Sequence, residues 1–580
     1  AGSSPRARSR RWARAPRSRT SISAWRPLRS LLARRAARAR GLLHGGAARL
    51  AVVLGFVAVF GAVVAAEYAV FRRGLDALAG LRLAGLALSL YFLESLFAVI
   101  LLIALVSYVA SGLWLFYRAR DTRLLLAAPL PLGGLYALRA LETFALTSWP
   151  LLIVGAPALV ALGRAHDQDA AFYLAGGGTL ALFAVFTGAT GALLTSAAGA
   201  ALRRAPTRLA VGVAVALLLA LFALAVGRHV IPSTADFYTI FEPGILNGKP
   251  SSIKFIEARF AVWPTHPFAA ALHAGATGSG AGAAASRAAL WLLPLGALVA
   301  AATLGRGLYR RALPAIAESF VLARGGRDAP VGARTFPRRL RGALGALVER
   351  DLLAIVRSPH EWSRAAFLGF LLALYTSFVF VAPLGEVADR PAAVARLLLL
   401  NVVASGYFVT AFGLRFVFPS ISLEGRAAWV LFSSPVRLAR LFFAKLGLFA
   451  GLLTVAVVPI ALAGTVRLVG HPVLVAATAA LLIMLVLTTA TLLLAFGAAW
   501  PDFRESDPES LSTSGGGLAA TLVCLGYVAL VGWIARGAAL AAAGGGSVAP
   551  WLALAAAVSA ALIAGALAVA LRRMRTLEVT

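Results

Sequence analysis

The chain has 580 residues, of which 60% are hydrophobic, yet it carries a formal charge of +32 from 55 Lys and Arg against 23 Asp and Glu. A soluble globular domain is about 45–50% apolar, so this composition excludes a soluble enzyme and a disordered chain. The single cysteine excludes a disulfide scaffold. What remains is a polytopic membrane protein that keeps its basic residues outside the bilayer.

The first 49 residues form a basic tail rich in Arg, Ser and Ala. Residues 28–50 are able to form a basic amphipathic helix that lies in the plane of the inner leaflet. We expect residues 1–25 to be a disordered tail or sequence upstream of the native start.

Twelve apolar runs follow, each long enough to cross a membrane, which takes about 20 mostly apolar residues. The sequence therefore predicts an all-α polytopic protein with about 12 transmembrane helices. The runs are 50–71, 95–117, 141–163, 172–200, 208–230, 287–306, 364–385, 396–419, 443–464, 473–500, 516–541 and 549–571.

The placement of Lys and Arg indicates the orientation of these runs. With the N-terminus inside and twelve alternating spans, 41 of the 55 basic residues fall in cytoplasmic segments and 13 in outside segments, and Arg415 lies inside a span. This bias obeys the positive-inside rule. It predicts that both termini are cytoplasmic.

An internal repeat divides the chain into two halves. Segment 124–129 reads Leu-Leu-Leu-Ala-Ala-Pro, and Arg139 stands ten residues beyond its proline. Segment 430–435 reads Val-Leu-Phe-Ser-Ser-Pro, and Lys445 stands ten residues beyond that proline, so the two segments differ by 306 positions. The same offset carries runs two to five onto runs eight to eleven. Chance likeness of leucine-rich segments is the alternative explanation.

We therefore expect three parts. Residues 1–49 are the tail and its in-plane helix, 50–325 the first six-helix half, and 326–580 the second half with an in-plane helix of its own. Six spans is an even number, so both halves share one orientation.

The centres of the runs carry almost no charge, since Glu94, Glu142 and Arg228 lie near run ends. An ion-driven carrier needs buried ionisable groups, so this pattern argues against one. No G-x-x-x-x-G-K-[ST] loop is present, and the nearest match, at 244–250, has the wrong spacing and ends in proline. ATP would then have to bind another chain. No catalytic, cofactor-binding or metal-binding residue is predicted.

A long segment on the expected outer face, 231–286, has only a short counterpart in the second half. It could be a lid, a gate or a docking element for a partner. A passive interfacial loop explains it equally well.

Several stretches resemble the type-2 class of ABC exporter permeases over roughly residues 50–580. The most specific is Leu-Arg-Phe-Val-Phe-Pro-Ser-Ile-Ser-Leu-Glu-Gly-Arg at 414–426, followed by Trp429 and Ser-Ser-Pro at 433–435. A second is Glu-Arg-Asp at 349–351 with Arg-Ser-Pro-His-Glu-Trp-Ser at 357–363, in which Ser358 replaces the aspartate usual in that family. Segments 121–129 and 501–504 are similar to it as well.

The resemblance implies that the proline-marked turns are helices that couple to an ATPase. The implied coupling residues are Ala127, Ala128, Pro129, Glu424, Arg426, Ser433, Ser434 and Pro435. It also implies that the in-plane helices are elbow helices, with Arg350, Asp351, Arg357 and Trp362 at the inner face and Arg415 at the inner end of its span.

The function expected on this basis is that of a permease subunit of an ABC exporter in the bacterial cytoplasmic membrane. It would be no enzyme itself and would hold no cofactor. Its expected partners are two copies of an ABC ATPase subunit, the lipid bilayer and an unidentified substrate, without nucleic acid. Two other classes stay open, namely a polytopic enzyme or scaffold that transports nothing, and an ion-coupled secondary transporter.

Overall fold

The computed structural model describes residues 47–79, 82–117, 119, 131–148, 151–202, 260–278, 284–313, 343–357, 368–376, 390–428, 438–469, 471–505 and 511–575. Every regular element within these ranges is a helix. The prediction of an all-helical fold is thereby confirmed for the described residues.

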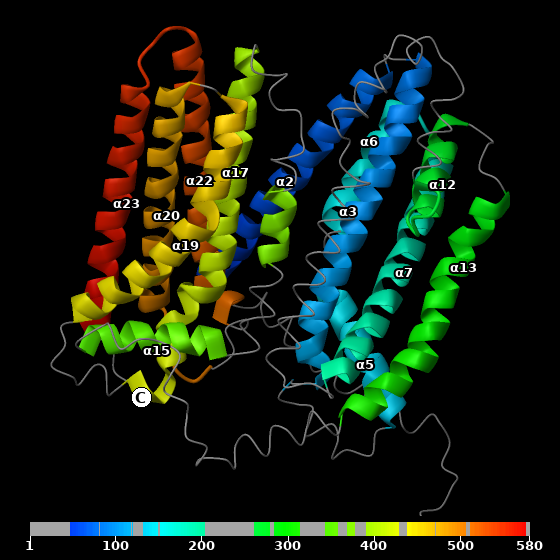
Figure 1. The fold of residues 1–580 in the computed structure, drawn as a ribbon, viewed down its shortest axis with the longest axis horizontal. Coiled ribbons are helices and arrows are strands. Elements are labelled where there is room, and N and C mark those ends of the chain that lie inside the picture. The colour runs from blue at the N-terminus through cyan, green and yellow to red at the C-terminus, as the bar shows by residue number, and fades with distance from the viewer. Residues whose placement is uncertain are drawn as a thin grey trace, which may run out of the picture.

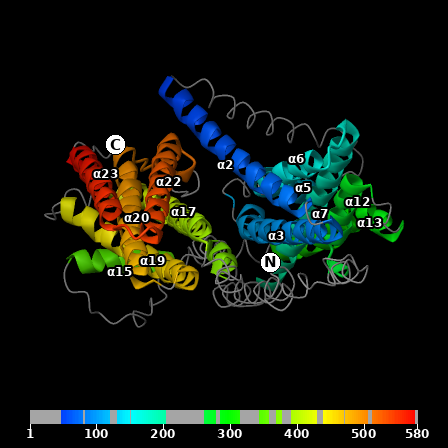
Figure 2. The same cartoon turned by 90° about the horizontal axis from the view of Figure 1, so that it is seen from above.

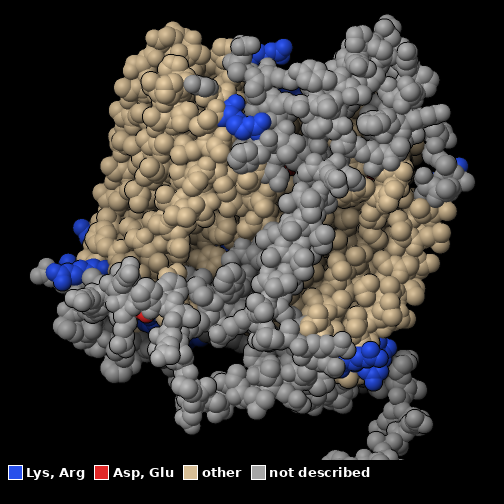
Figure 3. All heavy atoms as spheres, in the orientation of Figure 1, with Lys and Arg blue, Asp and Glu red and all other residues tan. Residues whose placement is uncertain are grey.

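Eight helices of the described residues are long and apolar enough to cross a membrane. They are Leu88–Tyr117, Ala170–Ala201, Arg287–Leu313, Pro391–Gly425, Leu438–Leu468, Pro472–Ala499, Gly515–Ala543 and Ala549–Arg575. On the described surface drawn in Figure 3, the visible Lys and Arg side chains lie toward the ends of the helices, and the tan surface between them shows no charged side chain. This distribution is the one that a bilayer requires.

The helices form two groups that stand side by side (Figure 1). The first group packs around aromatic side chains, because Phe183 meets Phe97 at a centroid distance of 4.8 Å and Phe268 at 5.1 Å. Its elements are α2 (Ala47–Ala79), α3 (Arg82–Tyr117), α5 (Leu132–Thr147), η3 (Leu151–Gly155), α6 (Ala156–Ala165), α7 (Ala170–Leu202), α12 (His266–Thr277), α13 (Ala284–Ala300) and η5 (Ala301–Gly305).

The second group is built around α20, which is apolar on all sides and is therefore a buried helix. In its most apolar stretch, 67% of α20 is buried, against 11% of α23, which lies at the edge of the group. The elements are α15 (Ala343–Arg357), α17 (Pro391–Phe416), η7 (Phe418–Ser420), η8 (Ser422–Ala427), α19 (Leu438–Leu468), α20 (Pro472–Ala499), α22 (Gly515–Ala543) and α23 (Ala549–Arg575).

Within the described residues, two apolar contacts between the groups stand out. Helix α2 runs obliquely from the first group toward α22 (Figure 2), where a Cβ added at Gly55 would lie 3.1 Å from Leu522. A second contact packs Ala98 of α3 against Phe370 of the helical stretch 368–376, and both side chains are fully buried. The groups are thus joined by apolar packing.

Two expectations about the spans need correction. The run 141–163 is not one continuous α-helix, because α5 ends at Thr147 and the short π-helix η3 begins at Leu151. The sequence has a proline between the two elements, at position 150, and proline lacks an amide hydrogen and disfavours a helical conformation in the residue before it.

The expected run 50–71 lies within α2, which is helical but is not among the eight apolar spans. The run 208–230 and most of 364–385 lie outside the described residues. The arrangement of twelve helices in two repeats is therefore not confirmed.

Candidate functional site

The candidate site lies at the end of the second group where α15 crosses the other helices (Figure 1), which we call the α15 end. Helix α15 is amphipathic and packs on α19, with Leu347 buried in the core of the group. Its charged residues Arg350 and Asp351 stand on the next turn. The sequence thus places a short polar helix against the start of a membrane helix.

Lys445, in the second turn of α19, is the centre of an ion cluster. Its side chain is only 3% exposed, and its Nζ lies 2.7 Å from Asp351 Oδ2 and 2.8 Å from Glu424 Oε1. The same ammonium also donates to the backbone carbonyl of Ser420 at 3.3 Å. Three donors thus meet three acceptors, which offsets the cost of burying the charge.

Arg350 closes the cluster from its exposed side. Its Nη2 lies 2.7 Å from Asp351 Oδ1 and 2.5 Å from Glu424 Oε1. Burial lowers the pKa of Arg350, but the hydrogen bonds and charges of Glu424 and Asp351 outweigh it, so that the net shift of its pKa is upward. Two cations and two carboxylates balance, and they tie α15, η8 and α19 together.

The chain that carries Glu424 is held by a glycine. Gly425 follows it with φ 58° and ψ −143°, a conformation that residues with a Cβ rarely adopt. Ser422 fixes the same turn from another side, because its Oγ accepts a hydrogen bond of 3.1 Å from the amide of Asp502. The Ser-Leu-Glu-Gly-Arg run therefore forms a defined turn that places the Glu424 carboxylate against Lys445.

The helix α20 approaches this region closely. A Cβ added at Gly497 would lie 2.2 Å from the carbonyl oxygen of Phe418 in η7. Any larger residue at this position must push η7 and α20 apart. The small side chain thus lets the turn sit directly on the buried central helix.

The structure brings three of the residues implied by the resemblance into one cluster, namely Arg350, Asp351 and Glu424. It adds Lys445, which the sequence had marked only as the basic residue ten positions beyond Pro435. Arg415 lies in the last turn of α17 and is half-buried. Arg426 belongs to η8 and Arg357 ends α15. The remaining positions lie outside the described residues: Ala127, Ala128, Pro129, Trp362, Ser433, Ser434 and Pro435.

The residue that the 306-position offset pairs with Lys445 is also a buried cation. Arg139 on α5 is fully buried, and its Nη1 lies 2.7 Å from Glu142 Oε2. Arg139 and Lys445 are therefore both buried and each forms an ion pair. The partner of Arg139 lies on the same helix, whereas the partners of Lys445 lie on α15 and η8.

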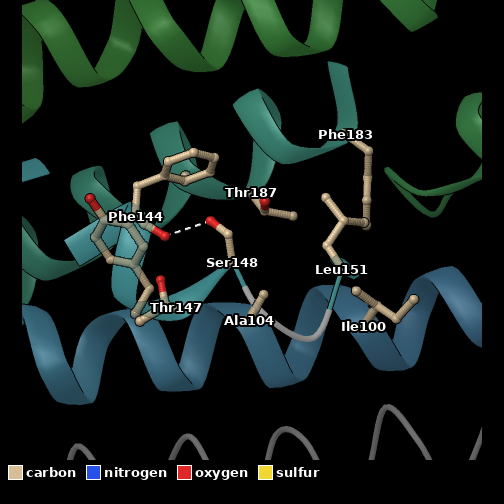
Figure 4. A pocket seen from close by; sticks show the side chains of 10 residues that line it. Ile100, Ala104, Phe144, Thr147, Ser148, Leu151, Phe183 and Thr187 are labelled. Atoms are coloured by element: carbon tan, nitrogen blue, oxygen red, sulfur yellow. Dashed lines mark hydrogen bonds between the residues drawn. The ribbon is translucent and has the colours of Figure 1, made fainter. Parts of the chain in front are cut away.

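The break between α5 and η3 opens a small cavity toward α3 and α7 (Figure 4). Its hydroxyl groups are those of Tyr108, Thr147, Ser148 and Thr187. The last three donate to a backbone carbonyl of their own segment, and Tyr108 on α3 donates to the carbonyl of Ala140 on α5. The remaining walls include Phe144, Phe183 and aliphatic side chains. Because no charged group lines this cavity, we favour the α15 end as the candidate site.

At the opposite end of the first group, α12 packs against α3 and brings a carboxylate and an imidazole together. Glu94 is 1% exposed, and its Oε1 lies 2.6 Å from His266 Nδ1. The sequence places Glu94 near the end of a run but does not reveal that its carboxylate is buried. The sequence could not reveal this pair because its members are 172 positions apart and meet only through folding.

Comparison with known proteins adds one finding. Residues 44–579 match the model of a family described as "Putative ATP-binding cassette". No curated protein and no solved structure matches the chain.

This match overturns four expectations. They are the resemblance to type-2 exporter permeases, the function of a permease subunit without an ATPase, the absence of enzymatic activity in this chain, and the two separate ATPase subunits as partners. A family of ATP-binding cassettes that covers nearly the whole chain points to ATPase activity in the chain itself. The absence of one short loop says little about a chain of 580 residues, and the family match extends over 44–579.

The described residues nevertheless do not fit a nucleotide in the usual way. The sequence has no G-x-x-x-x-G-K-[ST] segment, and the described ranges contain no strand that could lead into such a loop. We therefore assign no residue to ATP and derive no step through it.

Proposed function

Because the chain belongs to this ATP-binding-cassette family, we propose that it is a membrane-embedded ABC transport protein whose conformational cycle is driven by ATP. Eight apolar helices in the described residues support a role within the bilayer. The family supports a link to ATP. The α15 end is the structural element that transmits an ATP-driven movement to the membrane helices.

The ion cluster is the observation that carries this proposal. A helix that lies across the ends of membrane helices transmits little force through apolar contacts that can slide. Lys445, buried in α19, is instead held by Asp351 of α15 and by Glu424 of the η8 turn. Charged hydrogen bonds of this kind are short and directional, so a displacement of α15 is passed to α19.

We further propose that the α15 end faces the cytoplasm and that the two helix groups are repeats in parallel orientation. Helix α23 ends on that side with Arg572, Arg573 and Arg575, and basic residues at this end support the orientation. The shared burial and ion pairing of Arg139 and Lys445 support the repeat.

The proposal is tested by measuring whether ATP changes the distance between the two groups. Cysteines for spin labels replace Leu141 on α5 and Phe443 on α19, which are 64% and 50% exposed, in a background with Cys524→Ala. The full chain is studied in native membrane vesicles, so that any component it works with is present. We expect ATP with vanadate to change the spin–spin distance distribution relative to ADP.

A matched pair within the second group serves as the control. Labels at Phe443 and Trp500 report on α19 and the end of α20, which pack together, and this distance should stay constant. An unchanged distance between Leu141 and Phe443 in ADP, ATP and ATP with vanadate would refute the proposal. With Lys445→Met, we expect the ATP-dependent change to shrink, because α15 is then uncoupled from α19.

A further inference from the structure

Helix α12 carries two histidines that both face α3. His266 stands at its first turn and His273 two turns later, so that the two rings lie on one side of the helix. His266 reaches the buried Glu94, and His273 Nε2 lies 3.0 Å from Ser89 Oγ and 3.1 Å from the backbone carbonyl of Leu86. These polar contacts between α12 and α3 thus pass through titratable rings.

The remaining contacts of α12 with its neighbours are mainly apolar. Phe268 and Leu272 are buried against α3 and α7, and the only charged residue of the Leu88–Tyr117 span is Glu94. Gln168 donates to the carbonyl of Ala276 at 2.8 Å and ties the far end of α12 to the α6–α7 connection. The protonation of the two rings is therefore the variable part of this interface.

We propose that α12 and α3 form an acid-sensitive latch, in which neutral His273 and the Glu94–His266 pair keep α12 docked and protonation of His273 releases it. Helix α12 belongs to the segment 231–286, which has only a short counterpart in the second half of the sequence. With the orientation proposed above, α12 faces the compartment opposite to the α15 end.

The sign of the effect follows from where the His273 proton is bound. Burial lowers the pKa of His273 to about 4 in the docked helix, whereas a free imidazole titrates near pH 6.5. The released helix therefore binds more protons between these values, and docking weakens as the pH falls through that window. Above it His273 is neutral in both states and docking is complete.

Glu94 has a different role in the latch. Its carboxylate provides the counter-charge for His266, so protonation of this ring leaves a buried ion pair rather than an isolated cation. The acid response of the wild type therefore comes from His273. Without the carboxylate, His266 would become acid-sensitive as well.

The other charged or titratable residues around α12 are few. The elements that pack against it are α3, α6, α7 and α13. Besides Glu94, these elements and the α6–α7 connection carry Arg82, Tyr91, Tyr108, Tyr117, Arg164, His166, Asp167, Asp169, Tyr173 and Arg287. His166 lies near His273 and its charge adds to the lowering of the pKa of His273.

The test follows the position of α12 as a function of pH in the full chain, reconstituted in nanodiscs. Spin labels are placed at two exposed positions, Val262 just before α12 and Leu174 on α7, with Cys524→Ala. We expect one narrow distance distribution at pH 7.5 and a second, released population that appears between pH 6.5 and 4.

Three variants separate the roles of the side chains. His273→Gln keeps a hydrogen-bonding group that does not titrate, so the released population should disappear. Glu94→Gln should move the release toward neutral pH by about one unit or more, because His266 loses its counter-charge. His471→Gln, on an exposed histidine at the start of α20, should leave the profile unchanged.

A wild-type distance that is constant down to pH 4 would overturn the latch. The same would follow if His273→Gln released α12 at the same pH as the wild type. Equality of the His273→Gln and wild-type distributions at pH 7.5 shows that the variant is folded. No nucleotide is present, so the outcome is independent of the ATP experiment above.

Discussion

Replacing Lys445 by methionine removes the buried cation on which the α15 end depends. The variant keeps an apolar side chain of similar length, but Asp351 and Glu424, whose side chains are 12% and 9% exposed, lose their shared partner. Breaking a buried ion pair from one side costs about 3–5 kcal/mol. Because Arg350 still contacts both carboxylates and is 47% exposed, we expect a loss near the lower bound, about 3 kcal/mol.

The assay is the free energy of unfolding of the reconstituted protein, measured by reversible denaturation with SDS. Arg440→Met is the matched control, since Arg440 is an exposed cation one turn earlier on the same helix. It should change the stability by no more than about 0.5 kcal/mol.

A double-mutant cycle isolates the pairing itself. When Asp351→Leu is added to Lys445→Met, the two losses of stability should not add. Lys445→Met leaves the Asp351 carboxylate without its lysine partner, and Asp351→Leu then removes that carboxylate. Equal effects of Lys445→Met and Arg440→Met, or full additivity in the cycle, would refute the assignment of Lys445 as the centre of the cluster.

Two further changes test other parts of the second group. Gly425→Ala places a Cβ at φ 58° and should cost about 1–3 kcal/mol in the same unfolding assay, whereas Gly451→Ala, on α19 with open space around it, should not destabilise the protein. Asn401→Leu removes hydrogen bonds of 3.0 Å from α17 to Ala461 and Thr465 of α19 and should cost about 0.6–1.7 kcal/mol. An Asn401→Leu variant as stable as the wild type would show that these contacts contribute nothing to helix association.

Much of the architecture could be predicted from the sequence, because a bilayer restricts which structures can span it. Long apolar runs must become helices, since no water satisfies the backbone inside the membrane. The runs 473–500, 516–541 and 549–571 were placed to within a few residues of α20, α22 and α23. The expected continuous span 141–163 was wrong, because mean hydropathy outweighed a proline that divides it.

Only some residues of the candidate site could be predicted from the sequence. The Glu-Arg-Asp and Ser-Leu-Glu-Gly-Arg segments were singled out through a resemblance, and Arg350, Asp351 and Glu424 do meet. Their common partner was missed, because Lys445 belongs to a third segment and its spacing from Pro435 says nothing about what it contacts. The assignment to a permease without an ATPase was wrong, since one absent loop was given more weight than the whole chain supports.

The sequence by itself determined that this is a helical membrane protein with a charge excess outside its spans, because hydropathy and charge act locally along the chain. Only the tertiary structure decided which charges are buried and with whom. Lys445 joins Asp351 from 94 positions away, and Glu94 joins His266 from 172. Such pairs depend on how helices pack against one another. Packing is a property of side-chain shapes in three dimensions that no run of residues records.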